Sequence, residues 1–301
     1  MRRWAALLLG LVLALAGCAA PSSSGTRPQI VVTTNILGDV VRAVAGDQAD
    51  VTTLMKPNAD PHSFEISAQE AALLGTADLA VSNGLGLEEG LQQHLDRAAE
   101  SGVDMVVAGN AIEVLAYGPE NDGAPDPHFW TDPQRMVDVV DALEDALAGI
   151  DGIDEGAIRA HADAYRAELA DLDAEMTTAF SAIPEDHRAL VTNHHVFGYL
   201  ADRFGFRIVG AVIPGGTTLA APSAADLRDL AVAIEEAGVP TIFAESSQPD
   251  RLVQVLAREA GIRVDVVELF TESLTGPGEG ADTYLTMMRT NTERIAQGLR
   301  R

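Results

Sequence analysis

Short runs of β-branched and aliphatic residues alternate with longer amphipathic stretches from residue 29 onward. In the first half of the chain we predict four strands, near 30–34, 51–55, 79–82 and 105–108. Helical patterns separate them near 37–45, 68–75 and 87–99, and a further helix follows Pro133. Such alternation of strands and helices is typical of a parallel sheet with crossover helices.

A long uninterrupted helical pattern divides the chain. Residues 154–180 contain no Pro or Gly after Gly156, so we expect one long helix. The alternation then resumes, with strands near 189–192, 207–213, 241–244 and 263–267 and helices near 196–204, 224–238, 249–260 and 282–299. The sequence therefore predicts an α/β fold of two lobes with parallel sheets flanked by helices, with boundaries at 28–152, 153–183 for the linking helix, and 184–301.

The first residues predict export and a lipid anchor. Two arginines precede the apolar run 5–16, which has about the length of the hydrophobic part of a signal peptide and is too short to span a bilayer. The run ends in Leu-Ala-Gly-Cys, the small-residue pattern that precedes the cysteine of bacterial lipoproteins. We therefore interpret 1–17 as a signal peptide, Cys18 as the lipidation site and 18–27 as a flexible tether. Two acyl chains on Cys18 would anchor the protein to the cell membrane outside the cytoplasm.

The composition narrows the choice of partners. The chain has 45 Asp and Glu against 20 Lys and Arg, a net charge of −25, which disfavours nucleic acid and leaves no basic patch for anionic lipid. We interpret this excess mainly as solvated surface, with a cation as the easier partner. Cys18 is the only cysteine, so no disulfide can form and packing must supply the stability.

Histidines supply the candidate metal ligands. Three of the seven, His94, His161 and His187, lie in charged or polar stretches where a solvated histidine is the ordinary outcome. His62 and His128 share the context Asp-Pro-His, followed by an aromatic residue. The proline stiffens the backbone, and the carboxylate can hold the second ring nitrogen of a metal ligand. Each alone also fits a helix-entry turn with an incidental histidine.

His194 and His195 follow a predicted strand, where ligands bind in open parallel sheets. Successive residues there face opposite ways, so only one of them can face the space between the lobes. The residues alone leave that choice open.

Five stretches resemble the successive signatures of the zinc and manganese substrate-binding proteins of bacterial ABC importers. They are NADPHSFE (58–65), DPHFWTDP (126–133), TNHHVFGYL (192–200), FAESSQPDR (243–251) and DTYLTMMRTN (282–291). The resemblance covers nearly the whole mature chain. It implies a carrier rather than an enzyme, which holds a metal ion between its lobes and delivers it to a permease and its ATPase. A metallochaperone that loads the carrier, and action as a monomer, are compatible with it.

The resemblance also implies the third ligand. Phe197 and Tyr199 match the family pattern if that ligand is His194, which makes His195 a neighbour. Zinc carriers of the family keep histidine there, whereas manganese carriers typically have a carboxylate, and imidazole suits zinc. The segment 117–125, however, contains no histidine where many zinc carriers have a His-rich loop, so manganese stays open.

Two acidic residues compete for the fourth ligand position. Glu245 ends an apolar strand, where a buried carboxylate plays a structural role. Asp282 follows the Gly-rich stretch 276–281, whose flexibility would let it close onto the ion. We therefore expect a zinc site between the lobes with His62, His128, His194 and Asp282 as ligands, supported by Glu245 and His195.

Two functions from other classes are weaker alternatives. A zinc hydrolase needs an open coordination position and a general base, and no His-Glu-x-x-His motif occurs in the chain. Some members of the family that this chain resembles are known as adhesins, but the sequence contains no aromatic-rich stretch that would support such a role. A metal carrier remains the interpretation that accounts for all five stretches.

Overall fold

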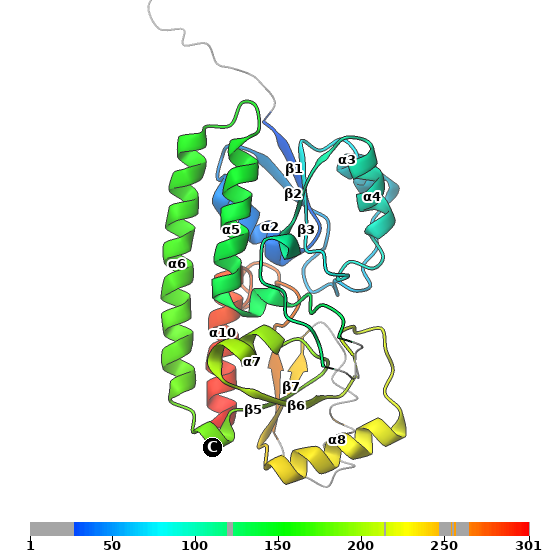
Figure 1. Cartoon of the computed structure of the whole chain (residues 1–301), viewed down its shortest axis with the longest axis vertical. Helices are drawn as coiled ribbons and strands as arrows, with labels where there is room; N and C mark the ends of the chain where they lie inside the picture. The colour runs from blue at the N-terminus through cyan, green and yellow to red at the C-terminus, as the bar shows by residue number, and fades with distance from the viewer. Residues whose placement is uncertain are drawn as a thin grey trace, which may run out of the picture.

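The computed structural model describes residues 27–118, 123–213, 215–246, 254, 256 and 265–300. Within these ranges the chain forms two α/β lobes, with a long helix running along one side of both (Figure 1). None of the helices in the described part of the chain is long and apolar enough to cross a membrane. The predicted signal peptide, Cys18 and all but the last residue of the tether lie outside the described residues.

A four-stranded parallel sheet forms the first lobe, in the order β2-β1-β3-β4. Its strands are β1 (Gln29–Val32), β2 (Asp50–Thr53), β3 (Leu79–Ser82) and β4 (Asp104–Val107). The central strands β1 and β3 are apolar almost throughout, because both faces of the sheet are covered. One face packs against α3 (Ala68–Leu74) and α4 (Gln92–Glu100), and the other against α2 (Asn35–Ala45).

Two further helices close the side of the molecule. They are α5 (Pro133–Ala148) and the predicted long helix, α6 (Glu155–Ser181), which is a single helix of 27 residues. Apolar residues of α6 recur every three or four positions and form one buried stripe, at Ile158, Ala162, Tyr165, Leu169, Leu172, Met176 and Phe180. This stripe packs against helices of both lobes, which fixes the lobes to a common support.

The second lobe repeats the architecture, with a parallel sheet in the order β6-β5-β7-β8. Its strands are β5 (Ala189–Thr192), β6 (Arg207–Ala211), β7 (Thr241–Glu245) and β8 (Asp265–Leu269). Its helices include α7 (Gly198–Phe204), α8 (Ala224–Ala237) and α10 (Tyr284–Leu299). The helix predicted at 249–260 lies almost entirely outside the described residues.

One predicted helix begins later than the sequence pattern indicates. The pattern predicted 87–99, whereas α4 begins at Gln92. The preceding residues form a loop around the buried carboxylate of Glu88, which accepts hydrogen bonds from Thr33 Oγ1 at 2.6 Å and Asn83 N at 2.7 Å. These bonds satisfy donors at the carboxyl ends of β1 and β3, and they outweigh the local preference for helix.

The segment that follows β8 is held by the first lobe. Asn35 Nδ2 donates to Ser273 Oγ at 2.8 Å, and Asn35 Oδ1 accepts from Leu274 N at 2.9 Å. Trp130 Nε1 donates to the carbonyl of Thr271 at 2.8 Å. These buried bonds cross between the lobes and fix the position of the residue between them, Glu272.

Candidate metal centre

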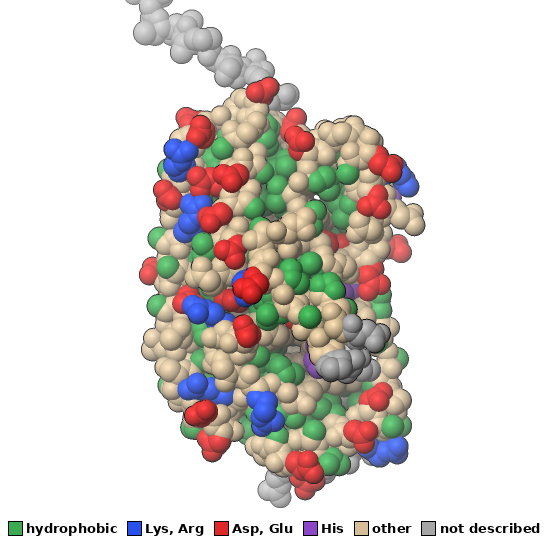
Figure 2. Space-filling view, in the orientation of Figure 1, with side chains coloured by type: hydrophobic (Ala, Val, Ile, Leu, Met, Phe, Trp, Pro, Cys, Tyr) green, Lys and Arg blue, Asp and Glu red, His purple; other side chains and the backbone are tan. Residues whose placement is uncertain are grey.

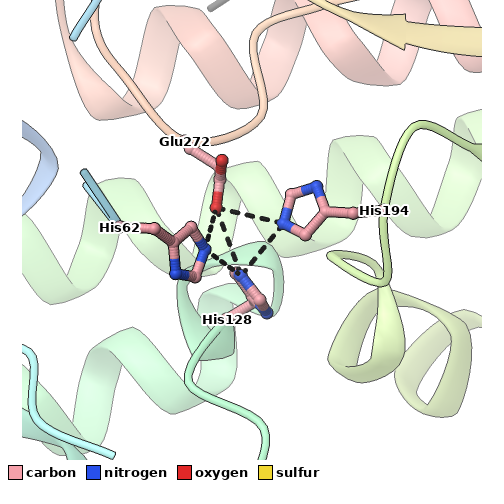
Figure 3. A group of neighbouring side chains, drawn as sticks. All are labelled: His62, His128, His194 and Glu272. Carbon is pink, nitrogen blue, oxygen red and sulfur yellow. Dashed lines mark hydrogen bonds and ion pairs between the residues drawn. The ribbon is translucent and has the colours of Figure 1, made fainter. Parts of the chain in front are cut away.

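Three histidines and one glutamate meet between the lobes (Figure 3). His62 comes from the loop after β2, and His128 directly precedes the 3-10 turn Phe129–Thr131. His194 follows β5, and Glu272 follows β8. Each lobe therefore contributes two side chains, from loops beyond the strands as expected for open parallel sheets.

The four donor atoms are close enough to share one ion. Glu272 Oε1 lies 2.9 Å from His62 Nε2 and 3.2 Å from Nε2 of both His128 and His194. His128 Nε2 lies 3.4 Å from His62 Nε2 and 3.3 Å from His194 Nε2. In a tetrahedral zinc site with bonds of about 2.0–2.1 Å, neighbouring donors lie roughly 3.3–3.4 Å apart. Five of the six donor pairs, at 2.9–3.4 Å, lie at or somewhat below that spacing, and all four donors lie within 4.8 Å of one another.

The group is closed to solvent. His128 and His194 are 0% exposed, Glu272 1% and His62 2%. Little histidine surface is visible in Figure 2, whereas Asp and Glu side chains are scattered over that face. Burying four convergent polar side chains away from water is unfavourable unless their electron pairs are satisfied, and either protons or a cation can satisfy them.

Both Asp-Pro-His segments fold into the same turn. His62 N donates to Asp60 Oδ1 at 2.9 Å, and His128 N donates to Asp126 Oδ1 at 2.9 Å. The same oxygen of Asp126 lies 2.8 Å from His128 Nδ1, so this carboxylate also orients the ring. His62 Nδ1 has no hydrogen-bond partner among the described residues. The expectation that the aspartate holds the ring is therefore confirmed for His128 but not for His62.

Glu245 and His195, the two residues predicted to support the site, both lie outside the group of four. Glu245 Oε1 lies 2.6 Å from His194 Nδ1, the ring nitrogen that faces away from the other histidines in Figure 3. Of the two neighbouring histidines, His194 is the one that faces the group. His195 is half-buried, and its peptide oxygen accepts a hydrogen bond from the Tyr117 hydroxyl at 3.3 Å.

Charge is balanced within the group. Burial alone would lower the pKa of His194, but Glu245 and Glu272 outweigh burial and hold that pKa well above its usual range. Burial likewise opposes the raised pKa of His128, which Asp126 and Glu272 produce. Burial would raise the pKa of Glu272, but the histidines, His194 first, hold it well below its usual range. Without a metal, His128 and His194 therefore hold protons beside an ionised Glu272, and a cation would take the place of those protons.

Asp282 does not join this group. Its Oδ2 accepts a hydrogen bond from Gly278 N at 2.9 Å, and its Oδ1 accepts one from Thr286 Oγ1 at 3.3 Å. These bonds keep the carboxylate at the start of α10, where a helix N-terminus favours an anion. The structure therefore does not bring Asp282, the predicted fourth ligand, to the three histidines, and the carboxylate that lies beside them is that of Glu272.

Glu272 was not among the predicted ligands, although its position just after a predicted strand could have indicated it. The last predicted strand was ended at residue 267, whereas β8 extends to Leu269. Glu272 then falls just beyond the carboxyl end of a strand, the same kind of position that Glu245 occupies on β7. Applying the strand-end rule to both carboxylates would have made Glu272 a candidate.

Tyr117 covers the outer side of His128. Its hydroxyl lies 2.9 Å from His128 Nδ1. Burial, and then the charge of Asp126, raise the pKa of Tyr117, so the hydroxyl keeps its proton. The ring is also one wall of a cavity of about 630 Å³, which Asp126, His195 and Gly198 line as well.

Comparison with known proteins identifies the family of the chain that carries this centre. Residues 30–298 match the family described as ZnuA, zinc-uptake complex component A, periplasmic. The chain belongs to this family. The relationship that the five signature stretches predicted is thereby confirmed.

Members of the ZnuA family that resemble the chain differ in the metal they are named for. The zinc-binding protein TroA of Treponema pallidum is 30% identical over 279 residues, which cover 91% of this chain and 90% of that protein. The manganese-binding lipoprotein MntA of Halalkalibacterium halodurans is 28% identical over 297 residues, 97% of each chain. The solved structure of TroA matches with a TM-score of 0.85 at 29% identity, over 91% of this chain and 100% of that one.

Proposed function

We propose that this ZnuA-family protein binds one zinc ion between its lobes and delivers it to an ABC permease for import. Family membership makes it the metal-binding substrate-binding component of an importer rather than an enzyme. Because the relatives are named for zinc or for manganese, the choice of metal depends on the donor atoms of this chain.

The observation that supports zinc is the set of three imidazole nitrogens and one carboxylate oxygen that lie within 4.8 Å of one another, most of them at spacings near those of a tetrahedral zinc site. Imidazole suits zinc, whereas manganese favours carboxylate, carbonyl and water oxygens. His62, His128, His194 and Glu272 would leave a net charge near +1 on the ion. The carboxylates of Asp126 and Glu245 lie directly behind two of the rings and offset that charge.

Because the proposed centre lies between the lobes, capture of the ion and its delivery to the permease depend on how the two lobes are held together. The permease and its ATPase complete the importer to which proteins of this kind belong. All four donors come from one chain, so capture of the ion needs no second copy and we expect a monomer. The helix α6 packs against both lobes, so we expect small lobe shifts rather than wide hinge opening, with release assisted by the permease.

The anchor is the second part of the proposal. Relatives over nearly the full chain are lipoproteins by name, including MntA and the manganese carrier PsaA of Streptococcus pneumoniae, which places the protein outside the cytoplasm at a membrane. We infer that the anchor is a lipidated Cys18, because it is the only cysteine and follows the small-residue pattern of lipoprotein cleavage sites.

Manganese is the second candidate cargo, and one observation favours it. The segment 117–125 contains no histidine, although many zinc carriers have a His-rich loop there. The test is metal analysis of protein purified without added metal, followed by competition between zinc and manganese for metal-free protein. We expect one zinc per chain and retention of zinc against an excess of manganese. Preferential retention of manganese would contradict the zinc assignment.

A further inference from the structure

We propose that the hydroxyl of Tyr117 is a positioning group that joins the two lobes at the metal centre and slows release of the ion. This inference rests on the proposed metal-binding function. Tyr117 belongs to the first lobe, where its hydroxyl lies 2.9 Å from His128 Nδ1. The same hydroxyl donates to the peptide oxygen of His195 in the second lobe at 3.3 Å. Because His195 is covalently joined to His194, one oxygen atom connects the ligand segments of both lobes.

The directions of the hydrogen bonds define what the hydroxyl does. A metal on His128 Nε2 leaves the ring proton on Nδ1. That proton faces Asp126 Oδ1 at 2.8 Å and the hydroxyl oxygen of Tyr117 at 2.9 Å. The hydroxyl accepts there and gives its own proton to the carbonyl of His195, so every donor in the chain has an acceptor. This series of hydrogen bonds, from His128 through Tyr117 to His195, is complete only while the two lobes are in contact.

The backbone of the first lobe holds Tyr117 in place. Tyr117 N donates to Ala124 O at 2.9 Å, and Asp126 N donates to Leu115 O at 2.8 Å. These bonds pair the two sides of the segment that leads from Tyr117 to His128. The hydroxyl is therefore presented by a braced segment, which favours a positioning role over incidental contact.

The second lobe leaves room for the tyrosine ring. A Cβ atom added at Gly216 would overlap ring atoms and the hydroxyl of Tyr117. Gly216 is not among the glycines with positive φ, so glycine here provides space rather than conformational freedom. Gly216 thus offers a way to disturb Tyr117 from the opposite lobe without changing Tyr117 itself.

Loss of the hydroxyl should act on metal release. Without it, water in the adjoining cavity can bond His128 Nδ1 and the carbonyl of His195 separately, but separate waters do not couple the lobes. Changes that loosen a formed complex act mainly on dissociation rates. Removing a partner of a metal-bound histidine commonly weakens affinity about 10- to 100-fold. Since Asp126 still orients the ring, we expect the lower end of that range.

The test compares zinc release from the full mature protein and its variants. Zinc-loaded wild type, Tyr117→Phe and Gly216→Ala are mixed with excess chelator, and association is followed separately by stopped flow. We expect both variants to release zinc about 10-fold faster, with association within about twofold of wild type and unchanged melting of the metal-free protein. If Gly216 acts through Tyr117, the double variant should release zinc no faster than the more affected single variant.

Matched controls keep the outcome specific. Tyr165→Phe removes a buried hydroxyl that has no hydrogen-bond partner among the described residues, and Gly75→Ala adds a methyl group where only ordinary contacts form. Both should release zinc like wild type. If Tyr117→Phe releases zinc at the wild-type rate, the inference is overturned and the proposed function still stands. The same conclusion follows if the variant releases zinc at the wild-type rate but its metal-free form melts at a lower temperature. Failure of wild-type protein to bind zinc would overturn the proposed function and this inference together.

Discussion

Glu272 Oε1 lies 2.9 Å from His62 Nε2, although the two residues are 210 positions apart in sequence and belong to different lobes. Both side chains are buried, so water does little to screen their attraction. The same oxygen also reaches the other two histidines of the group. Glu272 is therefore the side chain through which all three imidazoles are joined.

Replacing Glu272 by glutamine should weaken zinc binding strongly. The amide keeps the shape of the side chain but removes the only negative charge among the four donors. Because loss of a partner behind a ligand already costs about 10- to 100-fold, loss of this ligand should cost at least about 100-fold in affinity. Asp282→Asn is the matched control and should bind zinc like wild type. Calorimetric titration checks both, and the reverse pattern would restore Asp282 as the ligand.

The carboxylates behind the histidines should matter less than the ligands but still measurably. Glu245→Gln and Asp126→Asn each remove the charge beside one Nδ1 atom, of His194 and His128 respectively. We expect each to lower zinc affinity about 10- to 100-fold. Competition against a fluorescent chelator measures the effect. Asp60→Asn, in the equivalent turn before His62, should have the smallest effect of the three, and an equal loss there would contradict this assignment of roles.

Stability of the metal-free protein should depend on pH in a defined way. The pKa of His194 lies well above 6.5, so its contribution is complete below pH 6.5 and is lost as the pH rises through the raised value. The pKa of Glu272 lies well below 4.5, so its contribution is present above pH 4.5 and is lost as the pH falls through the lowered value. Both contributions are complete between pH 4.5 and 6.5.

Melting temperatures of the metal-free and zinc-loaded protein, measured from that range up to alkaline pH, test this dependence. The metal-free protein should lose stability on the alkaline side, and His194→Ala should flatten that loss. Zinc replaces the proton on His194 Nε2, so the loaded protein should stay stable at alkaline pH. Metal-free wild type that becomes steadily more stable above pH 6.5 would show that His194 is not held protonated by its neighbours.

The third histidine should set metal preference. His194→Glu replaces an imidazole by a hard oxygen donor, which suits manganese better than zinc. We expect the ratio of zinc to manganese affinity to fall by about 10-fold or more, mostly through weaker zinc binding. Titration of both proteins with both metals measures the ratio. An unchanged ratio would mean that position 194 does not determine selectivity.

The anchor can be tested apart from the metal site. Cys18→Ser removes the only thiol in the chain, so no other residue can accept a thioether-linked lipid. The variant should leave the detergent phase on phase separation and appear in the aqueous phase, while its zinc affinity stays the same. Partitioning of Cys18→Ser with the detergent, as for wild type, would refute lipidation at this residue.

Most of the fold could be predicted because each element has a local cause. Capping boxes begin α3 at Ser67 and α8 at Ser223, each formed by residues three positions apart, and α6 follows from an unbroken helical composition. The start of α4 could not be predicted, because it depends on Glu88 bonding to residues that only the folded sheet brings near. Long-range hydrogen bonds of this kind leave no periodic signal in sequence.

The site was predictable where local sequence determines geometry. His62 and His128 were recognised from Asp-Pro-His turns, which set the backbone within three residues. Glu272 was missed because its position depends on bonds from Asn35 and Trp130 in the other lobe, to the residues on either side of it. Asp282 was preferred for the flexibility of the glycines before it, but a backbone N–H of that same stretch binds its carboxylate.

Zinc X-ray absorption of protein loaded with one equivalent of zinc tests the central claim most directly, because it reports the donors around the ion. The account predicts four nitrogen and oxygen neighbours at about 2.0–2.2 Å, with imidazole scattering from three of them. That scattering should weaken in His62→Ala, His128→Ala and His194→Ala alike, and remain unchanged in Asp282→Asn. A six-coordinate shell dominated by oxygen, or imidazole scattering indifferent to all three histidine substitutions, would contradict a centre built from His62, His128, His194 and Glu272.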